Sequence, residues 1–141
     1  MGFFDKLKAS VGIGQPKMQL TVNSTQVKAG ATLAGSFTLT AQDREVPVKQ
    51  FEVELIQVKT TREWSDTTKD YVNRKHNNTL VKKVIAKNDE VIKSKQSMTE
   101  SFEVIVPSDV FSTGQWYSYQ LKVSADIPGL DASDKAEIFV A

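Results

Sequence analysis

Residues 116–127, WYSYQLKVSADI, alternate between apolar and polar side chains along their whole length after the first tryptophan. The apolar residues are Tyr117, Tyr119, Leu121, Val123 and Ala125. The polar residues between them are Ser118, Gln120, Lys122 and Ser124. A period of two is typical of a β-strand that packs one face on a core and exposes the other to water. The stretch therefore predicts a long strand with both tyrosines on its buried face.

The same alternation recurs on either side of this stretch. It covers residues 18–22, 33–39, 47–58, 80–85, 98–106 and 136–140. In the long third run, Phe51, Val53 and Leu55 share one face, whereas Ile56 and Val58 point the other way, which indicates a β-bulge or a change of exposure near Leu55. No helical period follows residue 15. The pattern predicts an all-β, antiparallel β-sandwich domain of about seven or eight strands over residues 15–141.

Residues 59–78 are the longest polar interruption, and they contain Trp64, Tyr71, Val72 and the turn-forming pair Asn77-Asn78. We interpret the segment as a projecting hairpin or a mobile loop. Trp64 and Trp116 are the two aromatic side chains that we expect to be exposed, and both are candidates for partner binding.

Residues 1–14, MGFFDKLKASVGIG, have a different period. Phe3, Phe4, Leu7 and Val11 recur at three- and four-residue spacing, and the glycines that follow supply a stop, so we predict a short amphipathic helix. About a dozen residues are too few to form a stable helix alone. We expect its apolar face to pack on the sandwich, with a partner groove or a membrane interface as the alternatives, and its four apolar residues are candidate partner-binding residues.

The composition of the chain bears on its cellular compartment and on the kinds of partner that it could bind. The chain has 141 residues, no cysteine and a formal net charge of +1, so it predicts one domain without a disulfide framework. Asp5, Lys6 and Lys8 interrupt the apolar run that a secretory signal needs, and no stretch is long enough to span a bilayer. We expect a cytoplasmic protein.

Two segments carry a family resemblance: GFFDKLKASVGIGQPKMQLTV at residues 2–22 and WYSYQLKVSADIPGLDASDKAEIFV at residues 116–140. They resemble the bacterial sporulation-control family, the arrestin-like group that contains the sporulation stage-zero M protein. Members of that family carry two arrestin-type (immunoglobulin-like) sandwiches in tandem, and this chain is expected to be a single-domain version. The resemblance implies a soluble bacterial protein with an arrestin-like fold, no known catalytic residues and a regulatory or scaffolding role.

Catalytic chemistry has little support in the residues. His76 is the only histidine, it lies among Arg74, Lys75 and Asn77, and there is no cysteine and no Gly-x-Ser-x-Gly turn. We interpret His76 as a solvated loop side chain. Neither an enzyme nor a cofactor is expected.

Two other clusters have both a functional and a structural interpretation. Asp126, Asp131 and Asp134 lie within nine residues and suggest a calcium site, although we favour Asp131 and Asp134 as turn caps and Asp126 as the end of a strand. Residues 69–95 hold eight Lys and Arg against three acids. We do not expect nucleic-acid binding there, because lysines on strands also prevent edge-to-edge aggregation.

The leading hypothesis is therefore a non-catalytic module that binds a regulatory or cytoskeletal protein. Binding would use an exposed sheet edge or the concave face, and edge-strand pairing would also allow a homo-oligomer. The alternative is a sandwich that binds carbohydrate or calcium through Trp64, Trp116 and the turn from Asp126 to Asp134.

Overall fold

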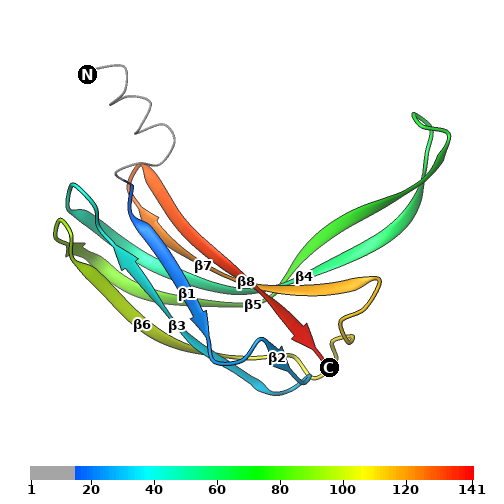
Figure 1. Cartoon of the computed structure of the whole chain (residues 1–141), viewed down its shortest axis with the longest axis horizontal. Helices are drawn as coiled ribbons and strands as arrows, with labels where there is room; N and C mark the ends of the chain where they lie inside the picture. Colours follow the sequence, from blue (N-terminus) through cyan, green and yellow to red (C-terminus); the bar gives the residue numbers. More distant parts are fainter. Residues whose placement is uncertain (1–14) are drawn as a thin grey trace.

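The computed structural model describes residues 15–141, which form eight β-strands in two sheets (Figure 1). The strands are β1 Lys17–Val22, β2 Gln26–Val27, β3 Thr32–Thr40, β4 Val46–Ser65, β5 Asp70–Ile92, β6 Ser97–Ile105, β7 Tyr117–Ile127 and β8 Leu130–Val140. Their order is β1-β3-β6 in the smaller sheet and β2-β8-β7-β4-β5 in the larger. This confirms the predicted all-β, arrestin-like sandwich, and the helix predicted over residues 1–14 lies outside the described residues.

One strand pair departs from the prediction of an antiparallel fold. β2 runs parallel to β8, with Gln26 opposite Phe139 and Val27 opposite Val140, whereas the other strand pairs are antiparallel. β2 has only two residues and follows β1 without a reversal of chain direction. It therefore joins the edge of the larger sheet while running in the same direction as β1.

The core lies between the inward faces of the two sheets. Phe37 of β3 is at its centre, with its ring centroid 4.7 Å from that of Phe51 on the opposite sheet and 6.2 Å from that of Phe102 on β6. The alternation in residues 116–127 also holds, because Tyr119 is only 2 % exposed and Leu121 and Val123 are fully buried. Burial of these side chains is the main source of stability for a sandwich of this size.

A β-bulge lies beside Leu55, but it is in the neighbouring strand, so of the two explanations predicted for the switch near Leu55 the change of exposure holds for β4. The register of β4 against β5 shifts between Leu55 and Ile56, whereas the register of β4 against β7 runs through the same point without a break. The extra residue therefore belongs to β5. β4 itself alternates without interruption, so Ile56 and Val58 lie on the face opposite to Phe51, Val53 and Leu55, and the apolar side chains of β4 change face near Leu55 as the sequence indicated.

Beyond Lys59, the last β4 residue opposite β7, β4 pairs with β5 alone. Figure 1 shows this hairpin projecting from the sandwich. We call residues 59–76 the arm. The polar segment thus forms the projecting hairpin of the prediction, and the alternative of a mobile loop was wrong, because continuous β-pairing extends to Ser65 and Asp70. Along residues 15–141, no helix is long and apolar enough to cross a membrane.

Candidate partner-binding surface

The register of the arm divides its side chains between two faces. Trp64 lies opposite Tyr71, Arg62 opposite Asn73, and Thr60 opposite Lys75, and these six residues form what we call the aromatic face. Glu63 lies opposite Val72, Thr61 opposite Arg74, Lys59 opposite His76 and Ser65 opposite Asp70, and these eight form the polar face. Because side chains alternate along each strand, every residue of the arm ladder is assigned to one face or the other.

The aromatic face carries an ordered, exposed ring pair near the tip of the arm. Trp64 and Tyr71 meet edge to face, with centroids 5.4 Å apart and ring planes at 75°, although the two residues are 52 % and 56 % exposed. The Arg62 guanidinium lies 5.4 Å from the centroid of the Tyr71 ring, and the indole N–H of Trp64 donates to Asp66 Oδ1 at 2.9 Å. These contacts fix the rings before any partner binds, which lowers the entropic cost of an interface.

The polar face holds the two strands of the arm together. Glu63 Oε2 pairs with Arg74 Nε at 3.0 Å, and Thr61 donates to Glu63 Oε1 at 3.1 Å. His76 Nε2 lies 3.0 Å from Thr61 Oγ1. His76 is therefore exposed, as expected, but it lies on a strand and not in a loop.

Among the described strands of residues 15–141, β5 is the terminal strand of its sheet, and none of them pairs with its outer edge. The backbone N–H of Thr60 donates to the carbonyl of Trp116 at 2.7 Å, so the backbone polar groups of Thr60 point away from β5. In an antiparallel pair, the residue directly opposite must then direct its own N–H and C=O outward. That residue is Lys75, and the same holds two residues on at Asn73.

Tyr71 agrees with this assignment. Its backbone N–H donates to the carboxylate Oδ1 of Asp70 at 2.7 Å and not to the opposite strand. Asn73 and Lys75 therefore present backbone donors and acceptors to solvent along the arm, which is the arrangement that strand addition requires.

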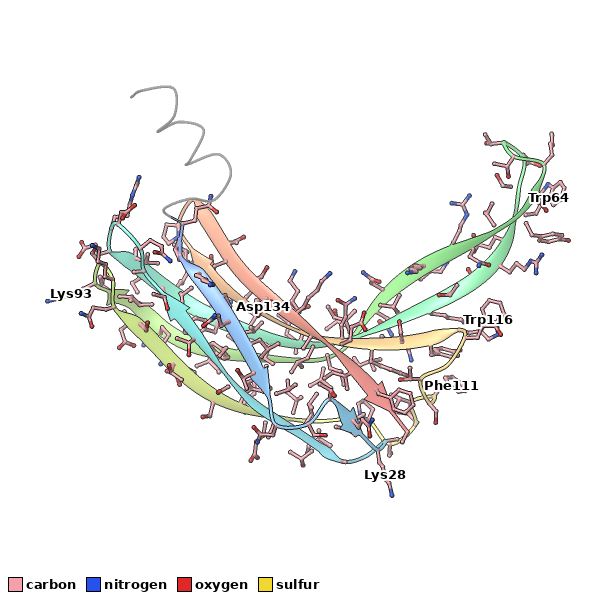
Figure 2. The ribbon with its side chains drawn as sticks, viewed as in Figure 1. Lys28, Trp64, Lys93, Phe111, Trp116 and Asp134 are labelled. Carbon is pink, nitrogen blue, oxygen red and sulfur yellow. The ribbon has the colours of Figure 1, made fainter. Side chains whose placement is uncertain are left out.

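Trp116 lies at the base of the arm, separate from Trp64 at the tip (Figure 2). It is 40 % exposed, as expected, and its neighbourhood contains Phe111 stacked on Tyr117 with centroids 4.6 Å apart. The Tyr119 hydroxyl donates to the Phe111 carbonyl, which ties this loop to the core. The two tryptophans thus do not form one aromatic platform for a sugar.

The outer face of the larger sheet carries one open groove around Ile56, Lys122 and Lys135 and another beside the base of the arm. The lining of the groove beside the arm includes Val58, Ser118, Gln120, Lys135 and Phe139. These side chains are mixed in character and come from strands that also form the outer surface of the sandwich.

The three aspartates do not converge. Asp126 and Asp131 lie opposite each other on β7 and β8, whereas Asp134 is three residues further along β8 and so points to the other face of the sheet. The interpretation of Asp131 and Asp134 as turn caps was wrong, since both lie within β8. Within residues 15–141, no group of three or more His, Cys, Asp or Glu residues is arranged to hold a metal ion.

Two sheets packed face to face, one of them extended by a β-hairpin arm, define this chain as an arrestin-like β-sandwich protein. Its sequence matches the profile of the Spo0M family, described as SpoOM protein, over residues 4–141, and the chain belongs to that family. A search of curated protein sequences gives no significant match. Membership in a sporulation-control family supports a regulatory role.

A solved structure supports the same fold. The crystal structure of Spo0M, the sporulation control protein from Bacillus subtilis, superposes with a TM-score of 0.75 at 16 % sequence identity. The match covers 89 % of this chain and 49 % of that one. The chain therefore spans about half the length of the Bacillus subtilis protein.

Proposed function

We propose that this chain is a non-catalytic, cytoplasmic regulatory protein that acts by binding a regulatory or cytoskeletal protein partner through its arm. The observation that carries the proposal is the Trp64–Tyr71 pair, which is exposed and yet fixed by contacts to Arg62 and Asp66. Buried Trp, Tyr and Arg side chains supply most of the binding energy in many protein interfaces. A large exposed ring pair on a projecting support is suited to that role.

The position of the pair supports a protein partner over a catalytic role. The arm stands clear of the sandwich core, and its polar side chains are engaged with one another: Glu63 with Arg74, and Thr61 with Glu63. Such an arrangement gives a partner a firm contact surface without an enclosed space for a substrate.

Co-purification from native cytosol tests the proposal. The full chain is compared with a Trp64→Ala/Tyr71→Ala double variant and with Ile105→Ala, a matched control that removes a side chain 65 % exposed on the other sheet. A partner should be captured by the wild-type chain and by Ile105→Ala, and lost from the double variant. Equal capture by all three chains would overturn the proposal for the arm.

The role predicted for Phe3, Phe4, Leu7 and Val11 stays a prediction. It is tested in the same experiment by a chain that lacks residues 1–14, after circular dichroism has shown that the sandwich is folded. Loss of the partner from that chain alone would assign recognition to the N-terminal segment and would contradict the proposal for the arm.

A further inference from the structure

The outer edge of β5 is covered by side chains where it runs along the sandwich and is open where it runs along the arm. Beside the sandwich, Lys83 Nζ donates to the Glu103 carbonyl of β6 at 3.4 Å, and Lys87 forms ion pairs with Glu90 and Glu100. These lysines reach from β5 toward β6 and cover the edge, which is a common protection against unwanted strand pairing. In the arm, β4 is the only neighbour of β5 within residues 15–141, and Asn73 and Lys75 direct their backbone groups outward.

Three consecutive residues of this open edge are cationic or can be protonated, whereas Asp70 at its distal end is acidic. Arg74, Lys75 and His76 are consecutive, so cationic or protonatable groups occur on both faces of the edge. The Arg74 guanidinium and the His76 ring both already lie against the Glu63 carboxylate, with Arg74 Nε 3.0 Å from Oε2 and His76 Nε2 3.5 Å from Oε1. Lys75, on the aromatic face, has no carboxylate within 4.0 Å among residues 15–141.

Toward the tip the edge becomes apolar. Tyr71 lies on the aromatic face and Val72 on the polar face, both next to the outward-facing backbone of Asn73. An added strand would thus meet positive charge near Lys75 and apolar surface near Tyr71. The added strand should therefore carry acidic residues where it passes Lys75 and an apolar residue where it passes Tyr71.

Two physical considerations favour a third strand at this position. A two-stranded ribbon that packs on nothing is only marginally stable in water, and a third strand adds a ladder of backbone hydrogen bonds and further cross-strand contacts. A second copy of this chain is a poor source of that strand, because pairing of two identical edges brings the Arg74–His76 segments of both copies together and like charges repel.

We propose that the β5 edge of the arm binds an extended acidic segment of a protein partner by strand addition. The backbone groups of Asn73 and Lys75 form the new ladder, the Lys75 ammonium selects acidic residues, and Tyr71 selects an apolar one. This inference rests on the proposed function and names the chemistry of the partner and the mode of its binding.

The test uses a capped synthetic peptide with three acidic residues at its centre and Val and Tyr on each side, so that both strand directions present the same chemistry. It is titrated into the isotope-labelled full chain and followed by NMR. Matched probes carry lysines in place of the acids, or N-methyl groups on alternate residues. Resonance shifts should be confined to the arm, and only the acidic, unmethylated peptide should bind.

Variants of the edge separate the backbone from the charge. Asn73→Pro removes an outward N–H without removing a bond to β4, a change that edge strands tolerate, and Asn73→Ala is its control. Lys75→Glu reverses the charge and breaks no ion pair. Affinity for the acidic peptide should fall about tenfold or more in Asn73→Pro and in Lys75→Glu, and stay near the wild-type value in Asn73→Ala.

Several outcomes would overturn the inference. They are equal binding of the lysine or N-methylated peptide, wild-type affinity in both Asn73→Pro and Lys75→Glu, self-association of the chain through β5, or binding to anionic lipid vesicles in place of the peptide. Co-purification separates this inference from the proposed function. A partner that is lost with Trp64→Ala/Tyr71→Ala but retained by Asn73→Pro and Lys75→Glu refutes strand addition and leaves protein binding by the arm intact.

Discussion

The backbone N–H of Leu20 donates to the carboxylate Oδ2 of Asp134 at 2.9 Å, and the two residues belong to different sheets. Leu20 lies on the edge strand β1, and Asp134 lies on β8 with its other oxygen accepting from the backbone N–H of Lys135. The carboxylate thus replaces the strand that β1 lacks on this side. On the opposite side, Lys87 and Glu100 join β5 to β6.

Substitution Asp134→Ala should therefore destabilise the fold. The Leu20 N–H is partly buried and would lose its partner, so we expect the free energy of unfolding to fall by about 1 to 2 kcal/mol. Urea denaturation measures the change. Asp131→Ala is the matched control: it removes a carboxylate from the same strand that lies opposite another, Asp126, and it should leave stability unchanged or slightly higher. Equal losses in the two variants would contradict the sheet-bridging role of Asp134.

Gly35 lies on the central strand β3, opposite Val22 of β1 and Phe102 of β6. A Cβ atom at this position would lie 2.4 Å from the Thr21 carbonyl oxygen and 2.9 Å from the Phe102 ring. Gly35→Ala should thus cost about 1 to 3 kcal/mol by overpacking, measured as a lower midpoint of thermal unfolding. Gly114→Ala, where a Cβ would meet no atom within 4 Å, should change the midpoint little.

Phe37 links the two sheets through Phe51. Phe37→Ala should reduce the free energy of unfolding by about 3 to 5 kcal/mol, because it removes both ring contacts and leaves a cavity between the sheets. Phe111→Ala removes the same side chain from an exposed loop and should cost much less. A small loss for Phe37→Ala would mean that the core collapses around the missing ring.

The ion pair of the arm should stabilise the arm itself and contribute little to the free energy of unfolding of the whole domain. Glu63 and Arg74 are each about half exposed, so Glu63→Gln should change global stability by less than about 1 kcal/mol. Loss of the charge should nevertheless loosen the distal hairpin and accelerate amide hydrogen exchange at Val72 and Arg74. Unchanged exchange at both amides would show that the backbone ladder alone holds the arm.

Alternation within a single strand is enough to predict part of this structure. It places Tyr119 in the core and reveals that the apolar residues of β4 change face near Leu55, because side chains alternate with a period of two along a strand. It does not predict the bond from Leu20 to Asp134 or the outward backbone of Lys75. Both depend on which strands lie side by side in the fold. Leu20 and Asp134 are 114 positions apart, so no local sequence pattern reveals their contact.

Site-specific photo-cross-linking in native cytosol is the most direct test of whether the arm is the partner-binding surface. A photoreactive side chain is placed at Asn73 in the full chain, and in a second chain at Ile105 on the other sheet. If the arm is that surface, Asn73 should give a defined protein adduct that is absent from Ile105 and is competed by the acidic peptide. The same adducts from both positions, or none from Asn73, would contradict partner binding by the arm.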